Sequence, residues 1–312
     1  MDSDFQALRE EIQKLKEQKN ALIMAHYYQR DEIQEIADFI GDSLALARKA
    51  AETDADIIVM CGVHFMGETA KILCPSKKVL VPDLEAGCSL ADSCDPEEFE
   101  RFVNEHPDHT VISYVNTSAA VKAHTDIVVT SGNARKIVES LPADEKIIFG
   151  PDKNLGGYIN TVTGREMLLW NGACHVHDRF SLEKIVDMKK EHPGAKILVH
   201  PECRRPLQLI ADKVGSTAAL LDFARNDEAK EFIVVTESGI LFEMRRACPD
   251  KTFLAAPAED SECMCNECDF MKMNTLAKVA AALRNEQPEI IVDAEIASKA
   301  LRPINRMLEL SN

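Results

Sequence analysis

The sequence lacks any run of about 18 consecutive apolar residues, the length that a helix needs to cross a bilayer. Its first twenty residues are charged and follow a helical period, which is unlike a secretory signal peptide. We therefore expect neither a membrane span nor a signal peptide, and we expect a cytoplasmic protein.

Basic stripes and Pro- or Ser-rich linkers are also missing. The formal net charge is −16, with 36 Lys and Arg against 52 Asp and Glu, and so acidic a chain repels nucleic acid in general. No nucleic-acid partner is therefore expected. Because 46% of the residues are hydrophobic and no linker separates them into blocks, we expect globular units that pack directly against each other.

The ten cysteines do not include the two CxxC pairs that are typical of a structural zinc site. In a reducing compartment, cysteines are candidates for metal binding or catalysis rather than for disulfides. Cys61, Cys74, Cys203 and Cys248 lie on or beside apolar runs, where cysteine is more often a small buried hydrophobe. Ligands must therefore be sought among the remaining cysteines.

A threefold repeat runs through the sequence. Strand-like apolar runs each end in a ring, with a second polar group two residues later: His26 and Tyr28, Tyr114 and Asn116, His200 and Glu202. Seventeen residues after each ring comes a hydroxyl beside a glycine: Ser43, Ser131 and Thr217. A cysteine closes each copy, 62, 60 and 68 residues after the ring: Cys88, Cys174 and Cys268. These matching spacings predict repeated β-α-β-α-β units.

Alternating strands and helices of this kind predict an α/β fold with parallel sheets. We expect three homologous αβα sandwich domains around a pseudo-threefold axis, with the active site at the centre. The predicted domains are residues 1–97 with an N-terminal helix, residues 98–183, and residues 184–312 with a C-terminal helical segment.

Ligands of parallel sheets bind outside the carboxyl ends of the strands, which is where the rings, hydroxyls and cysteines of the repeat lie. Three converging cysteines would hold a metal centre with one vacant position, such as a 4Fe-4S cluster whose open iron acts as a Lewis acid in a dehydration. Hydroxyls at helix N-termini would hold anionic substrate groups, and the candidates are Ser43, Ser131, Ser216 and Thr217.

Several motifs closely resemble those of the quinolinate synthase family, from about residue 20 to residue 280: AHYYQ, CGVHFMGETAKIL, YVNTSAAVKA, TSGNA, PDKNLG, VHPEC, VGST, TESGI and the MK after Cys268. The resemblance implies a transferase of NAD biosynthesis that condenses iminoaspartate with dihydroxyacetone phosphate to quinolinate, with loss of phosphate and two waters. It also implies three αβα domains and one 4Fe-4S cluster.

The resemblance assigns the site residue by residue. Cys88, Cys174 and Cys268 match the cluster ligands. His26 and Tyr28 resemble an acid/base pair, and Glu202 resembles a carboxylate that assists proton transfers beside His200, an imidazole expected to titrate near neutrality. The remaining matches resemble substrate-binding groups: Tyr114, Asn116, Ser43, Ser131, Ser216 and Thr217. The implied partners are an iminoaspartate-producing enzyme and the iron-sulfur assembly machinery.

One departure concerns the third ligand. Many bacterial family members carry CxxCxxC, whereas this chain has CxCxxC at 263–268, so Cys265 is a rival to Cys268. His175 and His177 directly follow a proposed ligand, which favours a contact with it rather than a ligand role, and Glu237 has a comparable supporting position after a strand.

Two other classes of function stay open at this point. Another hydro-lyase with an open cluster, acting on a hydroxy acid, would not need hydroxyl loops arranged for a phosphate as well as for carboxylates. A non-enzymatic iron-sulfur carrier would not need the polar groups at the strand ends. Both features therefore favour the synthase.

Overall fold

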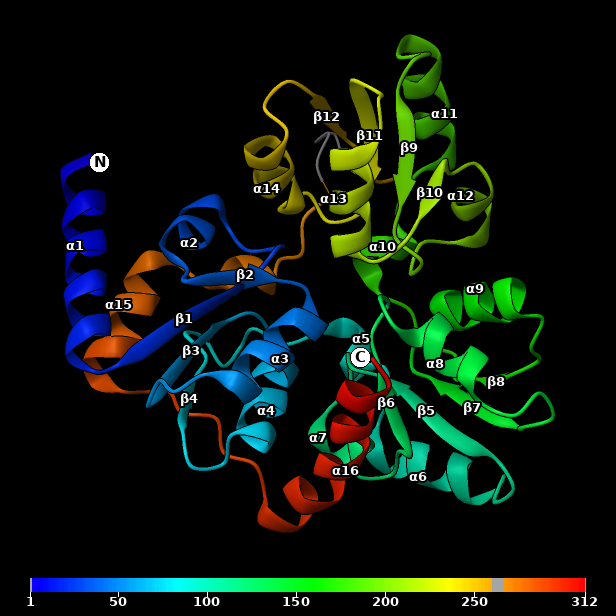
Figure 1. The fold of residues 1–312 in the computed structure, drawn as a ribbon, viewed down its shortest axis with the longest axis horizontal. Coiled ribbons are helices and arrows are strands. Elements are labelled where there is room, and N and C mark those ends of the chain that lie inside the picture. The colour runs from blue at the N-terminus through cyan, green and yellow to red at the C-terminus, as the bar shows by residue number, and fades with distance from the viewer. Residues whose placement is uncertain (1, 260–265, 312) are drawn as a thin grey trace.

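Three parallel four-stranded sheets organise the computed structural model, which describes residues 2–259 and 266–311 (Figure 1). Their strand orders are the same: β2-β1-β3-β4, β6-β5-β7-β8 and β10-β9-β11-β12. The predicted α/β class with three αβα units is therefore confirmed. Cys263 and Cys265 lie outside the described residues.

The first repeat begins with α1 (Asp2–Gln18) and continues with β1 (Ala21–His26), α2 (Asp31–Ile36), β2 (Phe39–Gly41), α3 (Ser43–Glu52), β3 (Ile57–Cys61), α4 (His64–Leu73), β4 (Lys78–Leu80) and α5 (Ser89–Asp92). The second runs through α6 (Pro96–Asn104), β5 (Thr110–Tyr114), α7 (Ala119–Lys122), β6 (Ile127–Val129), α8 (Ala134–Ser140), β7 (Ile147–Gly150), α9 (Lys153–Thr163), β8 (Leu168–Leu169) and α10 (His175–Asp178).

The third repeat has α11 (Leu182–Glu191), β9 (Lys196–Val199), α12 (Arg205–Leu209), β10 (Lys213–Val214), α13 (Thr217–Asn226), β11 (Glu231–Val235), α14 (Ile240–Ala247) and β12 (Thr252–Ala255). The chain ends with the 3-10 turn η1 (Met271–Met273), α15 (Leu276–Asn285) and α16 (Ala294–Leu310). Within the described residues, no helix combines the length and apolar character needed to span a bilayer.

An aspartate stabilises the same sheet position in every repeat. The carboxylate of Asp38 accepts the N–H of Ile23 at 2.9 Å, and Asp126 and Asp212 do the same for Val111 and Ile197 at 2.9 and 2.8 Å. Strands β2, β6 and β10 follow these aspartates and pair in parallel with β1, β5 and β9. These three strands could not be predicted from the sequence, because runs of two or three residues carry no detectable period.

Alternate residues of β1 pack on opposite faces of the first sheet, as the pleat requires. Ile23 and Ala25 belong to the cluster formed with α1 and α15, whereas Met24 packs with residues of α3 and α4. Helix α15 thus returns from beyond the third repeat to cover the first sheet beside α1 (Figure 1). Helix α16 packs against α4, α7 and β6, and so joins the first two repeats.

Candidate active site

One cavity is lined by residues that follow strands of all three sheets. Every candidate site residue from the sequence lines it except Ser216: His26, Tyr28, Ser43, Cys88, Tyr114, Asn116, Ser131, Cys174, His200, Glu202, Thr217 and Cys268. Ser216 instead caps α13, where its hydroxyl accepts the N–H of Ala219 at 3.3 Å. The repeat therefore brings its rings, hydroxyls and cysteines together in space.

The three cysteines of the cavity each begin a helical turn. Cys88 is the N-cap of α5, Cys174 is the N-cap of α10, and Cys268 precedes η1, and backbone N–H groups of the following turn act to lower the pKa of each thiol. Burial nevertheless raises the pKa of Cys88 to about 12 and that of Cys268 to about 11, and it raises the pKa of Cys174 as well. These thiols are therefore protonated at neutral pH unless a metal displaces the protons.

This donor set fits an iron-sulfur cluster better than a structural zinc ion. Among the described residues that line the cavity, the three thiols come one from each repeat, and no fourth cysteine joins them. A structural zinc site uses four protein ligands, whereas a cluster held by three thiolates keeps one iron open. Cys94 is buried away from the cavity lining.

Two imidazoles face the cavity in the same tautomer. The N–H of Tyr28 donates to Nδ1 of His26 at 3.2 Å, and the N–H of Glu202 donates to Nδ1 of His200 at 3.4 Å. Each ring therefore carries its proton on Nε2, and Nε2 of His200 lies 3.3 Å from the Ser131 hydroxyl. Burial lowers the pKa of both rings to about 3. The near-neutral titration expected for His200 is not what this environment produces, and both rings are neutral donors.

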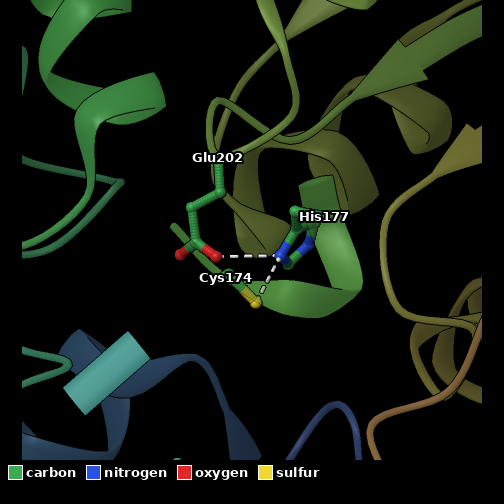
Figure 2. A group of neighbouring side chains, drawn as sticks. All are labelled: Cys174, His177 and Glu202. Atoms are coloured by element: carbon green, nitrogen blue, oxygen red, sulfur yellow. Dashed lines mark hydrogen bonds and ion pairs between the residues drawn. The ribbon is translucent and has the colours of Figure 1, made fainter. Parts of the chain in front are cut away.

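A buried network surrounds the carboxylate of Glu202. Its Oε2 lies 2.8 Å from Nδ1 of His177, which is also 3.3 Å from the sulfur of Cys174 (Figure 2). Its Oε1 accepts the hydroxyl of Tyr114. Burial acts to raise the pKa of Glu202, but the nearby imidazoles and these hydrogen bonds outweigh it and lower the pKa to about 2. Glu202 is therefore an ionised base inside a buried site.

Cys174, His177 and Glu202 lie close enough to hold a metal by themselves, since their ligand atoms are within 4.8 Å of one another. In the structure these atoms are within hydrogen-bond distance of one another, since Nδ1 of His177 lies 2.8 Å from Oε2 of Glu202 and 3.3 Å from the sulfur of Cys174. We interpret His177 as the partner that orients both the thiol and the carboxylate.

The phenol of Tyr28 lies between two threonine hydroxyls. Its oxygen is 2.7 Å from Oγ1 of Thr217 and 2.7 Å from Oγ1 of Thr236. Burial raises the pKa of Tyr28 well above its usual value, so the phenol keeps its proton. Because Thr236 also lies 2.9 Å from Nε2 of His177, hydrogen bonds connect the phenol of the first repeat to the carboxylate of the third.

His177 and Thr236 are site residues that the sequence did not reveal. The sequence predicted only a contact of His177 with Cys174, and it gave no prediction for Thr236. His177 lies three positions after Cys174, a spacing that brings the imidazole beside the thiol at a helix start, and this spacing was the available signal. Thr236 follows β11 directly, and its hydroxyl contacts Tyr28 and His177, which line the cavity.

Hydroxyl and amide groups also line the cavity. Ser43 and Thr217 are the first residues of α3 and α13, where helix N-termini favour negative charge. Oδ1 of Asn116 and Oγ1 of Thr130 are buried in the lining without a hydrogen-bond partner in the described protein. Such atoms are normally satisfied, so a bound polar group is the natural partner for both.

Comparisons with known proteins identify the family. Residues 10–309 match the model of the quinolinate synthetase A protein. A quinolinate synthase of Chloroherpeton thalassium is 55% identical over 304 residues, covering 97% of this chain and 94% of that protein. The chain belongs to the quinolinate synthase family. Quinolinate synthases of Synechococcus sp. and Nostoc punctiforme are 54% and 56% identical over 300 residues, covering 96% of this chain and 94% and 92% of theirs.

This membership confirms the resemblance inferred from the motifs. At this identity over nearly the whole length, the chain is an enzyme of the family. The cavity is its candidate active site, because it gathers an ionised base, a neutral phenol, two neutral imidazoles and three thiols from all three repeats.

Proposed function

We propose that the protein condenses iminoaspartate with dihydroxyacetone phosphate to form quinolinate, with release of phosphate and two waters. The observation that carries this proposal is the convergence of three cysteines with acid, base and anion-binding groups on one cavity, in a chain of the quinolinate synthase family. That combination provides for a metal centre, proton transfer and the binding of two anionic substrates at one place.

Cys88, Cys174 and Cys268 would hold one 4Fe-4S cluster. When bound, the cluster supplies an open Lewis-acidic iron suited to the loss of a hydroxyl group. Backbone N–H groups near the three sulfurs act to lower the pKa values of the thiols, but burial outweighs them, so binding of the cluster would have to displace the thiol protons.

The substrates would bind through hydroxyls and an amide rather than through cations. Ser43 and Thr217 offer helix N-termini for a phosphate or a carboxylate, and Ser131 and Asn116 offer further hydrogen bonds. Ser216 supports Thr217 by capping the same helix.

Proton transfer would be divided between Glu202 and Tyr28. The ionised carboxylate of Glu202 accepts a proton from a substrate carbon or nitrogen, with Tyr114 lining the same side, and the phenol of Tyr28 donates one to a leaving oxygen. The Nε2–H groups of His26 and His200 hold and polarise substrate oxygens. The hydrogen bonds through Thr236 provide a route that restores both groups between steps.

An assay without oxygen tests this function. Protein loaded with iron and sulfide is supplied with dihydroxyacetone phosphate and freshly generated iminoaspartate, and quinolinate is quantified by chromatography. Quinolinate formation that depends on both substrates is expected. If protein with a full complement of iron forms none, the proposal is wrong.

The same proposal includes the cellular setting expected from the sequence. The enzyme would act in the cytoplasm, where an iminoaspartate-producing enzyme supplies one substrate and the iron-sulfur assembly machinery supplies the cluster. An imine hydrolyses in water, so supply close to the site of use is chemically reasonable.

A further inference from the structure

Two buried carboxylates occupy the same position in the second and third repeats, and each binds the backbone of a cysteine. Asp152 lies two residues after β7, and its Oδ2 accepts the N–H of Cys174 at 3.3 Å. Glu237 lies two residues after β11, and its Oε1 accepts the N–H of Cys268 at 3.2 Å. Both carboxylates are 0% exposed. In the first repeat, the apolar Val63 occupies this position after β3.

Glu237 has further partners that Asp152 lacks. Its Oε1 lies 2.9 Å from Nζ of Lys272, and its Oε2 accepts the N–H of Gly239 at 2.7 Å. The same ammonium of Lys272 donates to the carbonyl oxygen of Tyr28 at 2.8 Å. One buried ion pair therefore joins the third sheet, the segment that carries Cys268, and the loop that carries Tyr28.

The turn after Glu237 packs directly on Tyr28. A Cβ atom added to Gly239 would lie 2.8 Å from both Cα and the carbonyl carbon of Tyr28, so only glycine fits there. From the other side, Nε of Arg30 donates to the carbonyl oxygen of Lys272 at 2.8 Å. The loop of the first repeat and the segment 266–273 therefore hold each other at several points.

These contacts engage both oxygens of Glu237. One oxygen receives an ammonium and a backbone N–H, and the other receives a second backbone N–H. Through them the carboxylate is tied to the segment that carries Cys268 and, by way of Lys272, to the carbonyl oxygen of Tyr28. The contacts of Glu237 therefore bear on where Cys268 and Tyr28 lie relative to each other.

We propose that Glu237 is a positioning residue that holds Cys268 at the cavity and, through Lys272, keeps the Tyr28 loop in place beside it. Asp152 performs the first of these tasks for Cys174. The inference rests on the proposed role of the cysteines as cluster ligands. It goes beyond that role because it predicts that cluster retention and turnover depend on different contacts of one carboxylate.

Iron retention tests the first task. Iron-loaded wild type, Glu237→Gln and Asp152→Asn are challenged with an iron chelator without oxygen, and the rate of iron loss is measured. The supporting groups of metal ligands typically change affinity about 10- to 100-fold, so we expect both variants to lose iron about tenfold faster or more. Glu243→Gln is the matched control, since Glu243 is a buried glutamate of the same repeat that pairs with Arg246 at 2.8 Å away from the cavity. It should lose iron like wild type.

Lys272→Gln separates the second task from the first. This variant keeps the carboxylate on the N–H of Cys268 but removes the contact with the Tyr28 carbonyl. We expect iron loss close to that of wild type, a kcat lowered about tenfold, and a KM for dihydroxyacetone phosphate changed by less than about threefold, because ground-state binding groups are untouched. Lys272→Arg should restore part of the kcat.

The outcomes distinguish this inference from the proposed function. If wild type retains no iron and forms no quinolinate, the proposed function is wrong. If wild type does both, and Glu237→Gln retains iron as well as Glu243→Gln does, Glu237 is not a positioning residue although the function stands. Should Glu237→Gln fail to fold, Asp152→Asn and Lys272→Gln decide the matter, and wild-type behaviour of both overturns the inference.

Discussion

The first and third repeats present the same backbone arrangement with different chemistry. Each places an imidazole at the end of its first strand, and the N–H two residues later holds Nδ1 of that ring. The residue that supplies this N–H is Tyr28 in the first repeat and Glu202 in the third. One side of the cavity therefore carries a phenol and the other a carboxylate, at equivalent positions.

The surroundings increase this difference. Burial keeps Tyr28 protonated although its hydrogen bonds with Thr217 and Thr236 act to lower its pKa, whereas His177 and Tyr114 keep Glu202 ionised. Pairs of titratable groups whose pKa values are driven apart typically divide acid and base roles between them. The repeated backbone therefore determines the position of each group, whereas the residues packed around the group determine its protonation state.

The largest effect is expected from removing the cluster that both Tyr28 and Glu202 are proposed to face. Cys268→Ser should abolish the visible absorbance of iron-loaded protein and all quinolinate formation, because two thiolates cannot replace three. Cys263→Ser should leave the absorbance unchanged. Absorbance spectra and iron analysis of the two variants provide the measurement, and a cluster retained by Cys268→Ser would transfer the ligand role to Cys265.

Glu202→Gln removes the negative charge that the third repeat contributes to the cavity. We expect turnover to fall by about 10³-fold, since loss of a positioned acid or base typically costs 10²- to 10⁴-fold. The amide cannot take up a proton, although it can still bond to Tyr114 and His177. Steady-state quinolinate formation at equal iron content measures the effect, and turnover within a few-fold of wild type would exclude Glu202 as the base.

Tyr28→Phe removes the neutral phenolic hydroxyl that the first repeat contributes to the cavity. We expect turnover to fall by about 10²-fold while the fold and the iron content are preserved, because the phenyl ring still fills the site and only the proton donor is lost. Tyr27→Phe is the adjacent control, since Tyr27 does not line the cavity. Equal activity of Tyr28→Phe and Tyr27→Phe would remove Tyr28 from catalysis.

The smallest expected effect concerns the shared imidazoles. Burial lowers the pKa of His26 to about 3, whereas the unfolded chain binds this proton at about 6.5. Stability is therefore greatest above about 6.5 and falls as the pH decreases toward about 3, because the unfolded state takes up protons that the folded state excludes.

Denaturant unfolding of metal-free protein at pH 7 and pH 5.5 measures this effect. The wild type should lose about 1 kcal/mol more free energy of unfolding over this interval than His26→Gln, which has no such proton to bind. Equal losses would mean that His26 is not held in the neutral form.

Much of the fold and of the site could be predicted from the sequence because the repeat is regular. The rings, hydroxyls and cysteines recur at fixed distances along the chain, and parallel strands bring their carboxyl ends to one edge. Ser43 and Thr217 begin helices as their glycine neighbours indicated. Ser216, the neighbour of Thr217, caps the helix instead of lining the cavity, a difference of one position that spacing cannot resolve.

Contacts between residues far apart in the sequence could not be predicted from local sequence patterns. The packing of α15 on the first sheet and of α16 against α4 and α7 depends on apolar faces that match across more than 150 residues of sequence. Thr236 and Lys272 reach the site through contacts with Tyr28, which lies more than 200 residues away along the chain. Periodicity describes neighbours along the chain and says nothing of such pairs.

The sequence by itself determined the α/β repeats, the convergence of three cysteines and the family, because these depend on local period and on spacing. Only the tertiary structure decided the protonation of the groups it brought together. Burial made the two imidazoles neutral, hydrogen bonds from His177 and Tyr114 kept Glu202 charged, and Glu237 came to bind Cys268 and Lys272 at once. The physical reason is that desolvation and hydrogen bonding act through space, between residues that the fold alone makes neighbours.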